Sequence, residues 1–172
     1  GAEHFYDSVS SMHCTAAPIR NMHGQLAGIL DLSSEGRLFH FDPVTVVGLY
    51  AASIENRLLV AQSMQLFIIR FQFMSAMVDT PMAGMLGFDE SGCLVWVNSM
   101  ASTLLRLPIE TAGRGEHTVE DIFELSPSQM RSMSDGGLRE LCLTNGPHVH
   151  IRCEARSFAR SFASAAPAVS HL

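Results

Sequence analysis

Residues 83–101 read AGMLGFDESGCLVWVNSMA, which is an apolar run, a four-residue turn and a second apolar run. In the turn at 89–92, the Asp side chain can bond the backbone two residues on, and the closing Gly accepts a positive φ. Residues 16–33, AAPIRNMHGQLAGILDLS, follow the same plan around the turn NMHG at 21–24. The sequence therefore predicts two β-hairpins in an α+β fold, an arrangement more natural for a pair of sensor modules than for an enzyme core.

A long helix is predicted between the two hairpins. Asp42 suits the N-cap and Pro43 the first helical position, and no further proline occurs before residue 78. We therefore expect one connecting helix over residues 42–78. Apolar residues at alternating steps of four and three form a coiled-coil-like seam with one polar position, Gln65, and predict a homodimer through the helix. The apolar seam residues are Val47, Ala51, Ile54, Leu58, Ala61 and Ile68.

Short helices and two more strands are predicted after the second hairpin. Asn98 is a natural cap for a helix over 99–107, and Thr118 and Ser126 can cap two further helical turns. Strands are expected at 138–143 and at 148–155, across the turn TNGP. The Ala/Ser-rich residues 157–172 are predicted to be a linker or tail.

Composition excludes several classes of protein. The chain has 172 residues and a formal net charge of −6 without a basic cluster, which argues against a nucleic-acid-binding surface. Its four cysteines are scattered without a CxxC pair, and no signal peptide is visible, so we expect reduced thiols in a cytoplasmic protein. The most apolar window, 66–88, is interrupted by charged residues and a proline and is a poor membrane span.

The chain opens at Gly1 without a methionine, and only about 40 residues precede the predicted helix. So short a piece cannot close a good core by itself. We expect it to be part of a longer module, whose missing partner is either upstream sequence or a second copy of the chain.

Two stretches resemble known sensor families. The stretch GMLGFDESGCLVWVN (84–98) is similar to the first two strands of PAS domains, and CTAAPI…AGILDLS (14–33) resembles the end of a GAF domain. The phrase SIENRL (53–58) on the following helix is more specific. Together they resemble the sensory region of sigma-54-dependent, Fis-type transcriptional activators similar to the acetoin catabolism regulator.

The resemblance implies an order of parts. Residues 1–41 would be the C-terminal strands of a truncated GAF domain, 42–78 a signalling helix, 79–156 a PAS-like domain and 157–172 a linker. The chain shows no Walker A motif and no helix-turn-helix pattern, so the ATPase and DNA-binding parts of such a regulator would lie outside it.

Methionines are frequent in the PAS-like half, and they could line a pocket for a small apolar ligand, although ordinary core packing is the simpler role for each one. Asn98 is most simply a helix cap that could also touch a ligand. The candidate ligand-binding residues are Met85, Phe88, Asn98, Met100, Leu104, Phe123 and Met130.

Metal and cofactor chemistry is not expected. His148 and His150 share one face of a predicted strand, but Cys153 has the opposite parity, and no fourth ligand stands out apart from the His13–Cys14 pair. His117 lies where some PAS domains carry a haem ligand, yet its charged surroundings favour exposure. Cys93 begins a strand and does not sit in the helical motif of flavin photosensors. We predict no metal, no cofactor and no catalytic residue.

Glu55, Asn56 and Arg57 fall on consecutive helical positions and face different directions. We expect them to make structural contacts from the helix to a sheet or a partner rather than to bind a ligand.

Three hypotheses for function follow. The first is a signal-sensing and dimerisation segment that binds a small metabolite and relays it through the helix to an output domain. The second is a ligand-free dimerisation scaffold. The third, a small metal-dependent enzyme built on the histidines, is the least favoured.

Overall fold

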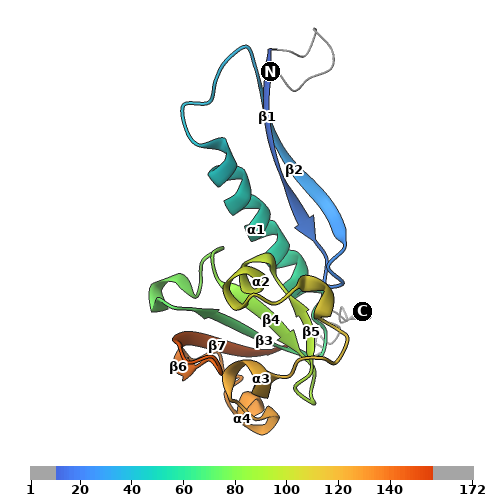
Figure 1. Ribbon diagram of the computed structural model, residues 1–172, viewed down its shortest axis with the longest axis vertical. Coiled ribbons are helices and arrows are strands. Elements are labelled where there is room, and N and C mark those ends of the chain that lie inside the picture. The colour runs from blue at the N-terminus through green and yellow to red at the C-terminus, as the bar shows by residue number, and fades with distance from the viewer. Residues whose placement is uncertain (1–10, 157–172) are drawn as a thin grey trace, which may run out of the picture.

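A β-hairpin, a long helix and a five-stranded sheet form the computed structural model, which describes residues 11–156 (Figure 1). The two sheets have the orders β1-β2 and β5-β4-β3-β7-β6, and every strand pair is antiparallel. The fold is therefore of the mixed α+β kind that the sequence predicts. The elements in chain order are β1 (Met12–Arg20), β2 (Leu26–Glu35), α1 (Pro43–Gln62), β3 (Leu66–Gln72), η2 (Ser75–Met77), β4 (Gly84–Phe88), β5 (Leu94–Val97), α2 (Ser99–Leu105), η3 (Ile109–Thr111), α3 (Val119–Phe123), α4 (Pro127–Ser132), β6 (Arg139–Cys142) and β7 (His148–Arg156).

The first hairpin is confirmed, and its turn uses the predicted chemistry. The Asn21 side-chain oxygen accepts hydrogen bonds from the backbone N–H groups of His23 and Gln25, at 2.9 and 3.0 Å. Gly24 has a φ of 72°, which an L side chain rarely adopts. The hairpin packs along α1, and its turn lies beside the C-terminal end of the helix, where the Met22 N–H donates to the Gln62 side chain at 3.2 Å (Figure 1).

The caps of the helices are also confirmed. The Asp42 side chain accepts from Val44 N–H at the start of α1, and a hydrogen bond from the Thr45 hydroxyl lowers the pKa of Asp42. Thr118 and Ser126 form capping boxes at the starts of α3 and α4. These local signals place the short helices where the sequence predicts them.

The predicted connecting helix is too long, because α1 ends at Gln62 and residues 66–72 form strand β3. The Ser63 hydroxyl donates to Leu59 O at 2.7 Å and closes the helix, and Gln65 then reverses the chain with a φ of 59°. The following run, LFIIRFQ, is rich in β-branched and aromatic residues and is half-buried or buried along its whole length. A strand covered on both faces shows no alternation, so its pattern resembles that of a buried helix.

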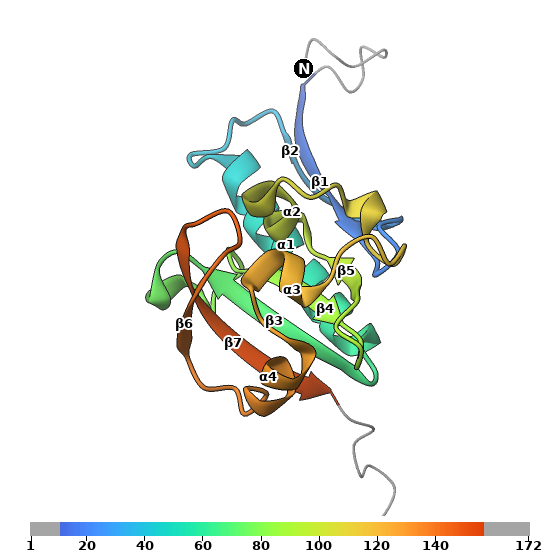
Figure 2. The ribbon, with the colours of Figure 1, turned by 60° about the horizontal axis from the view of Figure 1, so that its bottom comes forward.

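Strand β3 lies in the centre of the larger sheet, between β4 and β7. One face of this sheet packs against α2, α3 and α4 around a core that contains Phe71, Phe88 and Phe123. The other face packs against the C-terminal half of α1 through Leu59 and Trp96. Figure 2 shows α2 and α3 in front of the sheet, with α1 behind it.

Trp96 joins the sheet to the end of α1. Its indole N–H donates to the Ser63 hydroxyl at 2.8 Å, and the ring lies directly over Gly87 on the neighbouring strand. A Cβ atom at Gly87 would stand 2.2 Å from the indole nitrogen. The missing side chain of Gly87 therefore provides the space in which the indole reaches Ser63.

Replacing Gly87 by alanine is expected to destabilise the protein by about 1–3 kcal/mol, because the indole must move away and lose its bond to Ser63. Urea unfolding, followed through the fluorescence of this single tryptophan, measures the loss. Gly28→Ala on β2 is the matched control, because its Cβ meets nothing within 4 Å, and a change within about 0.5 kcal/mol is expected. Equal effects of the two substitutions would contradict the assignment.

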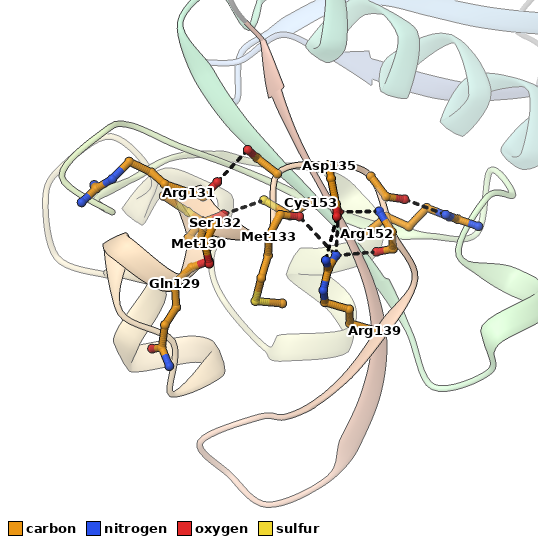
Figure 3. A network of polar contacts seen from close by, with 12 residues as sticks. Gln129, Met130, Arg131, Ser132, Met133, Asp135, Arg139, Arg152 and Cys153 are labelled. Atoms are coloured by element: carbon orange, nitrogen blue, oxygen red, sulfur yellow. Dashed lines mark hydrogen bonds and ion pairs between the residues drawn. The ribbon is translucent and has the colours of Figure 1, made fainter.

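Arg139 and Arg152 form a network of ion pairs and hydrogen bonds with the segment between α4 and β6 (Figure 3). Arg139 forms two hydrogen bonds to Asp135, of 2.7 and 2.8 Å, which hold the pKa of that carboxyl well below its usual range. Arg152 donates to Gly136 O at 2.7 Å and to Asp79 at 3.0 Å. The network joins the connection before β6 to β7 and to the segment that precedes β4.

Candidate functional site

A buried carboxylate in the middle of α1 joins three parts of the fold. Glu55 is 3% exposed. Its Oε2 accepts the backbone N–H of Arg20 at the end of β1, and its Oε1 accepts the N–H of Ser99 at the start of α2, both at 2.9 Å. Hydrogen bonds to an ionised acceptor are stronger than neutral ones. One side chain thus connects the hairpin, the long helix and the larger domain.

Asn98 continues the hydrogen-bond network, because it contacts Asn56, the residue next to Glu55 on α1. Its Oδ1 accepts the N–H groups of Met85 and Ala101, at 2.9 and 2.7 Å. Its Nδ2 donates to Asn56 Oδ1 at 2.7 Å and to Ala83 O at 3.0 Å. The helix-capping role predicted for Asn98 is confirmed, and the same side chain also holds β4 and α1 together. We call Glu55, Asn56 and Asn98 the Glu55–Asn98 network.

Two clefts lie on either side of this network, and Asn56 lines both. The larger cleft, of about 670 Å³, runs between α1, β3 and the segment before β4. The smaller cleft, of about 370 Å³, lies between α1 and α2 and has a mostly apolar lining that includes Leu49, Met82 and Met100. Asn56 also donates to Pro81 O, at 3.4 Å, in the wall of the larger cleft. An occupant of either cleft would therefore lie against the network.

Charge is concentrated in the larger cleft. Its lining includes Arg57, Arg70 and Arg156, together with Asp79. Arg70 is paired with Glu154 at 2.7 Å. Such a lining suits a polar or anionic small molecule, whereas the smaller cleft suits an apolar one.

The seven candidate ligand residues do not share one cavity. Phe88, Phe123 and Met130 are buried in the core beneath α2–α4, and Leu104 packs against that core. Met85 faces the opposite side of the sheet and lines the larger cleft. The remaining two, Asn98 and Met100, line the smaller cleft.

The residues of the predicted coiled-coil seam do not form one continuous exposed stripe. Val47 and Ala51 are buried within the chain. Ile54 is 42% exposed, and Ala61 is exposed, whereas Leu58 is half-buried. The last member, Ile68, lies on β3 and packs against Leu59.

The histidines of β7 lie on the face of the strand that the sequence predicts. His148 and His150 share one face of β7, and Cys153 is buried on the other. Within residues 11–156, no group of three or more His, Cys, Asp or Glu side chains could hold a metal ion. His117 is half-buried just before α3.

The structural contacts predicted for Glu55 and Asn56 are confirmed. The sequence does not reveal the partners of Glu55, because the bonded groups on Arg20 and Ser99 are backbone N–H groups, which every residue but proline has. The one available signal was a carboxylate in a strongly apolar stretch of helix, since buried charges are kept only where they are hydrogen-bonded.

Comparison with known proteins points to transcriptional regulators. No protein-family model matches the chain. It is 31% identical over 108 residues to the acetoin catabolism regulatory protein of Cupriavidus necator, a match that covers 60% of this chain and 16% of that protein. It is 24% identical over 107 residues to a signal-transduction and transcriptional-control protein of Clostridium beijerinckii, over 62% of this chain and 17% of the relative. The chain thus spans about a sixth of the length of the curated relatives that it matches.

Among solved structures, a chain of the E. coli DhaR(N)–DhaL complex matches with a TM-score of 0.33 and 16% identity, over 88% of this chain and 58% of that one. The two proteins matched in sequence are regulators by name, in agreement with the prediction that the chain is not an enzyme.

Within the described residues, α1 is the one helix that is long and apolar enough, by length and composition alone, to cross a membrane. A single helix of this kind is weak support for a membrane span. Glu55, in its middle, accepts hydrogen bonds from two other elements of the fold.

Proposed function

We propose that this chain is a signal-sensing and dimerisation segment of a bacterial transcriptional regulator in the cytoplasm. In this proposal a small metabolite binds beside the Glu55–Asn98 network, and α1 relays the event to an ATPase and DNA-binding output encoded elsewhere in the protein. The names of the relatives support the regulatory role. The observation that carries the relay is the Glu55 carboxylate, which is shared by the end of β1 and the start of α2.

A relay needs two arrangements that the ligand distinguishes, because a ligand with equal affinity for both shifts nothing. The network offers such a point, since its bonds run between elements far apart in the sequence. An occupant that draws Asn56 into either cleft would compete with the Asn56–Asn98 bond. The start of α2 would then lose one of its hydrogen bonds to α1.

The domain assignment belongs to the same proposal. The resemblance of the first hairpin to a GAF terminus and of residues 79–156 to a PAS domain supports two sensor modules. The central strand of the larger sheet is β3, in the order β5-β4-β3-β7-β6, and β3 lies before residue 79 in the sequence. We therefore propose that the PAS-like module begins at β3.

Dimerisation is proposed through the exposed side of α1. Tyr50 is 65% exposed, and Ile54 lies one turn further on. Ala61 continues the same side of the helix. Large apolar side chains that face solvent along one helix are typical of a contact with a second copy. This face also favours the alternative function, a dimerisation scaffold that binds no ligand.

Thermal-shift titration with acetoin and related small hydroxyketones and carboxylates tests the sensing role. Saturable stabilisation is expected, by about 2.7 kcal/mol at a ligand concentration one hundred times the Kd. Asn56→Ala should change the affinity, whereas Glu116→Gln, on an exposed loop, should not.

Sedimentation equilibrium of the same samples separates the two functions. Ile54→Glu should give a monomer, whereas Leu26→Glu, on the exposed face of β2, should leave the dimer intact. If the dimer depends on Ile54 but no compound in the library shifts the melting temperature, the chain is a dimerisation scaffold and not a sensor. A monomeric wild-type chain would remove the dimerisation role.

A further inference from the structure

The larger cleft, between α1, β3 and the segment before β4, has the opposite charge to the chain as a whole. The chain has 17 acidic and 11 basic residues. The residues that line this cleft reverse that balance, because three of them are arginines and only one is acidic. The positive charge of the cleft is therefore a local feature of the fold and does not follow from composition.

The carboxylates beside the cleft are already paired. Arg70 forms an ion pair with Glu154 at 2.7 Å, and Arg152 forms one with Asp79 at 3.0 Å. Arg70 and Arg152 are direct cross-strand partners on β3 and β7, and like charges in such a position repel each other. Each carboxylate therefore neutralises its own arginine, and neither is left to neutralise another.

Arg57 and Arg156 carry the charge that remains in the cleft. Arg57 lies on α1 and Arg156 ends β7, and both side chains are exposed. Within residues 11–156, no acidic side chain forms an ion pair with either of them. The cleft therefore has an excess of two positive charges, which come from elements far apart in the sequence.

The other groups in the cleft suit a small polar anion. A guanidinium presents its N–H donors in a planar fork that matches a carboxylate or a phosphate. The hydroxyls of Ser53 and Thr80 also line the cleft. Asn56 Nδ2 donates to Pro81 O at 3.4 Å and has a second N–H for an occupant. The volume of about 670 Å³ is typical of a small-molecule site.

We propose that the larger cleft binds a small molecule with two negative charges, a dicarboxylate or a phosphate ester, through Arg57 and Arg156. The inference rests on the proposed function, and it names the charge of the metabolite and the cleft that it occupies. Asn56 and Arg57 both line this cleft, so an anion bound by Arg57 lies beside the Glu55–Asn98 network. The smaller cleft is lined by no basic residue and includes the Glu55 carboxylate, which disfavours such an anion.

Isothermal titration calorimetry of the 172-residue chain with matched probes tests the charge requirement. Succinate and glycerol 3-phosphate are the two dianions, and the tighter of them identifies the anionic group. Butyrate has the length of succinate with one carboxylate fewer, and succinamide has no charge. Saturable binding is expected for at least one dianion at low salt. Butyrate should bind at least about tenfold more weakly than succinate, because charge-assisted hydrogen bonds are lost, and succinamide should not bind.

Substitutions test whether the charge acts within the cleft. Arg57→Gln and Arg156→Gln are each expected to weaken binding of the dianion by about tenfold. Arg37→Gln, on an exposed loop outside the cleft, is the matched control, because it changes the net charge equally and should leave the affinity unchanged. Circular dichroism and Trp96 fluorescence confirm that each variant is folded. Equal losses in all three variants, or an unchanged affinity in Arg57→Gln or Arg156→Gln, would overturn the inference.

Failure of this inference is distinguishable from failure of the proposed function. If neither dianion binds at millimolar concentration but an uncharged hydroxyketone stabilises the chain in the thermal-shift titration, the sensing role stands and the dianion site is wrong. If no compound of either kind binds, the sensing role and the dianion site are both wrong.

Discussion

Glu55→Ala is expected to lower the free energy of unfolding by about 2–5 kcal/mol, the largest effect that we expect from a single truncation in α1. The substitution leaves the N–H groups of Arg20 and Ser99 without their acceptor. Each buried donor that loses its partner costs about 1–3 kcal/mol. Urea unfolding followed by Trp96 fluorescence measures the change, since this indole is buried beside the end of α1.

Glu55→Gln tests whether both carboxylate oxygens contribute to stability. The amide keeps one oxygen acceptor but turns an NH₂ group toward the second N–H donor, so a smaller loss than in the alanine variant is expected. Glu116→Ala serves as the control, because its side chain is on an exposed loop, and a change within about 0.5 kcal/mol is expected there. An unfolding midpoint for Glu55→Ala equal to that of the control would contradict the bridging role of Glu55.

Asn98→Ala is expected to cost about 2–4 kcal/mol, because four hydrogen bonds disappear from a side chain that is 2% exposed. Asn98→Asp is more informative. Aspartate and asparagine are about equally good helix caps. At this position, however, a carboxylate oxygen would face Ala83 O and Asn56 Oδ1, which now accept hydrogen bonds from the amide.

We therefore expect Asn98→Asp to destabilise the protein by more than about 1 kcal/mol, in spite of its capping ability. Ser126→Asp at the start of α4 is the matched control and should be close to neutral, because its contacts with Gln129 are exposed and water can replace the hydrogen bond that the hydroxyl donates. Both variants are compared by urea unfolding. A neutral Asn98→Asp would show that the residue is only a cap.

The features that sequence analysis predicted correctly are local ones. The turn chemistry of Asn21 and Gly24 acts within a few residues, and so do the caps Asp42, Asn98 and Thr118. A short polar side chain next to an apolar run has few ways to satisfy nearby N–H groups. Such local signals therefore do not depend on the tertiary contacts of the rest of the chain.

The sequence does not predict the end of α1, because the signal for it is not local. No glycine or proline separates Gln62 from β3, and the apolar run 66–72 matches a buried helix as well as a buried strand. What makes it a strand is pairing with β4 and β7, and β7 lies some eighty residues further along the chain. Single-sequence patterns carry no information on such pairing.

The candidate site was predicted in part for the same reason. The charged phrase after Ile54 indicated structural contacts, and Glu55 makes them. The sequence indicates ligand residues by their type alone, and the alternation of β4 places Met85 and Phe88 on opposite faces of the sheet. Residue type alone cannot distinguish a core position from a cleft wall.

The central place of β3 has a consequence for how the protein is made. During synthesis, β3 can pair with β4 soon after both leave the ribosome, but its other edge stays open until β7 is complete. The open edge belongs to the segment LFIIRFQ, which combines high β-propensity with a single charge and no proline. We therefore expect nascent chains that pause before residue 148 to expose an unpaired strand edge and to aggregate more readily than chains in which β7 is complete.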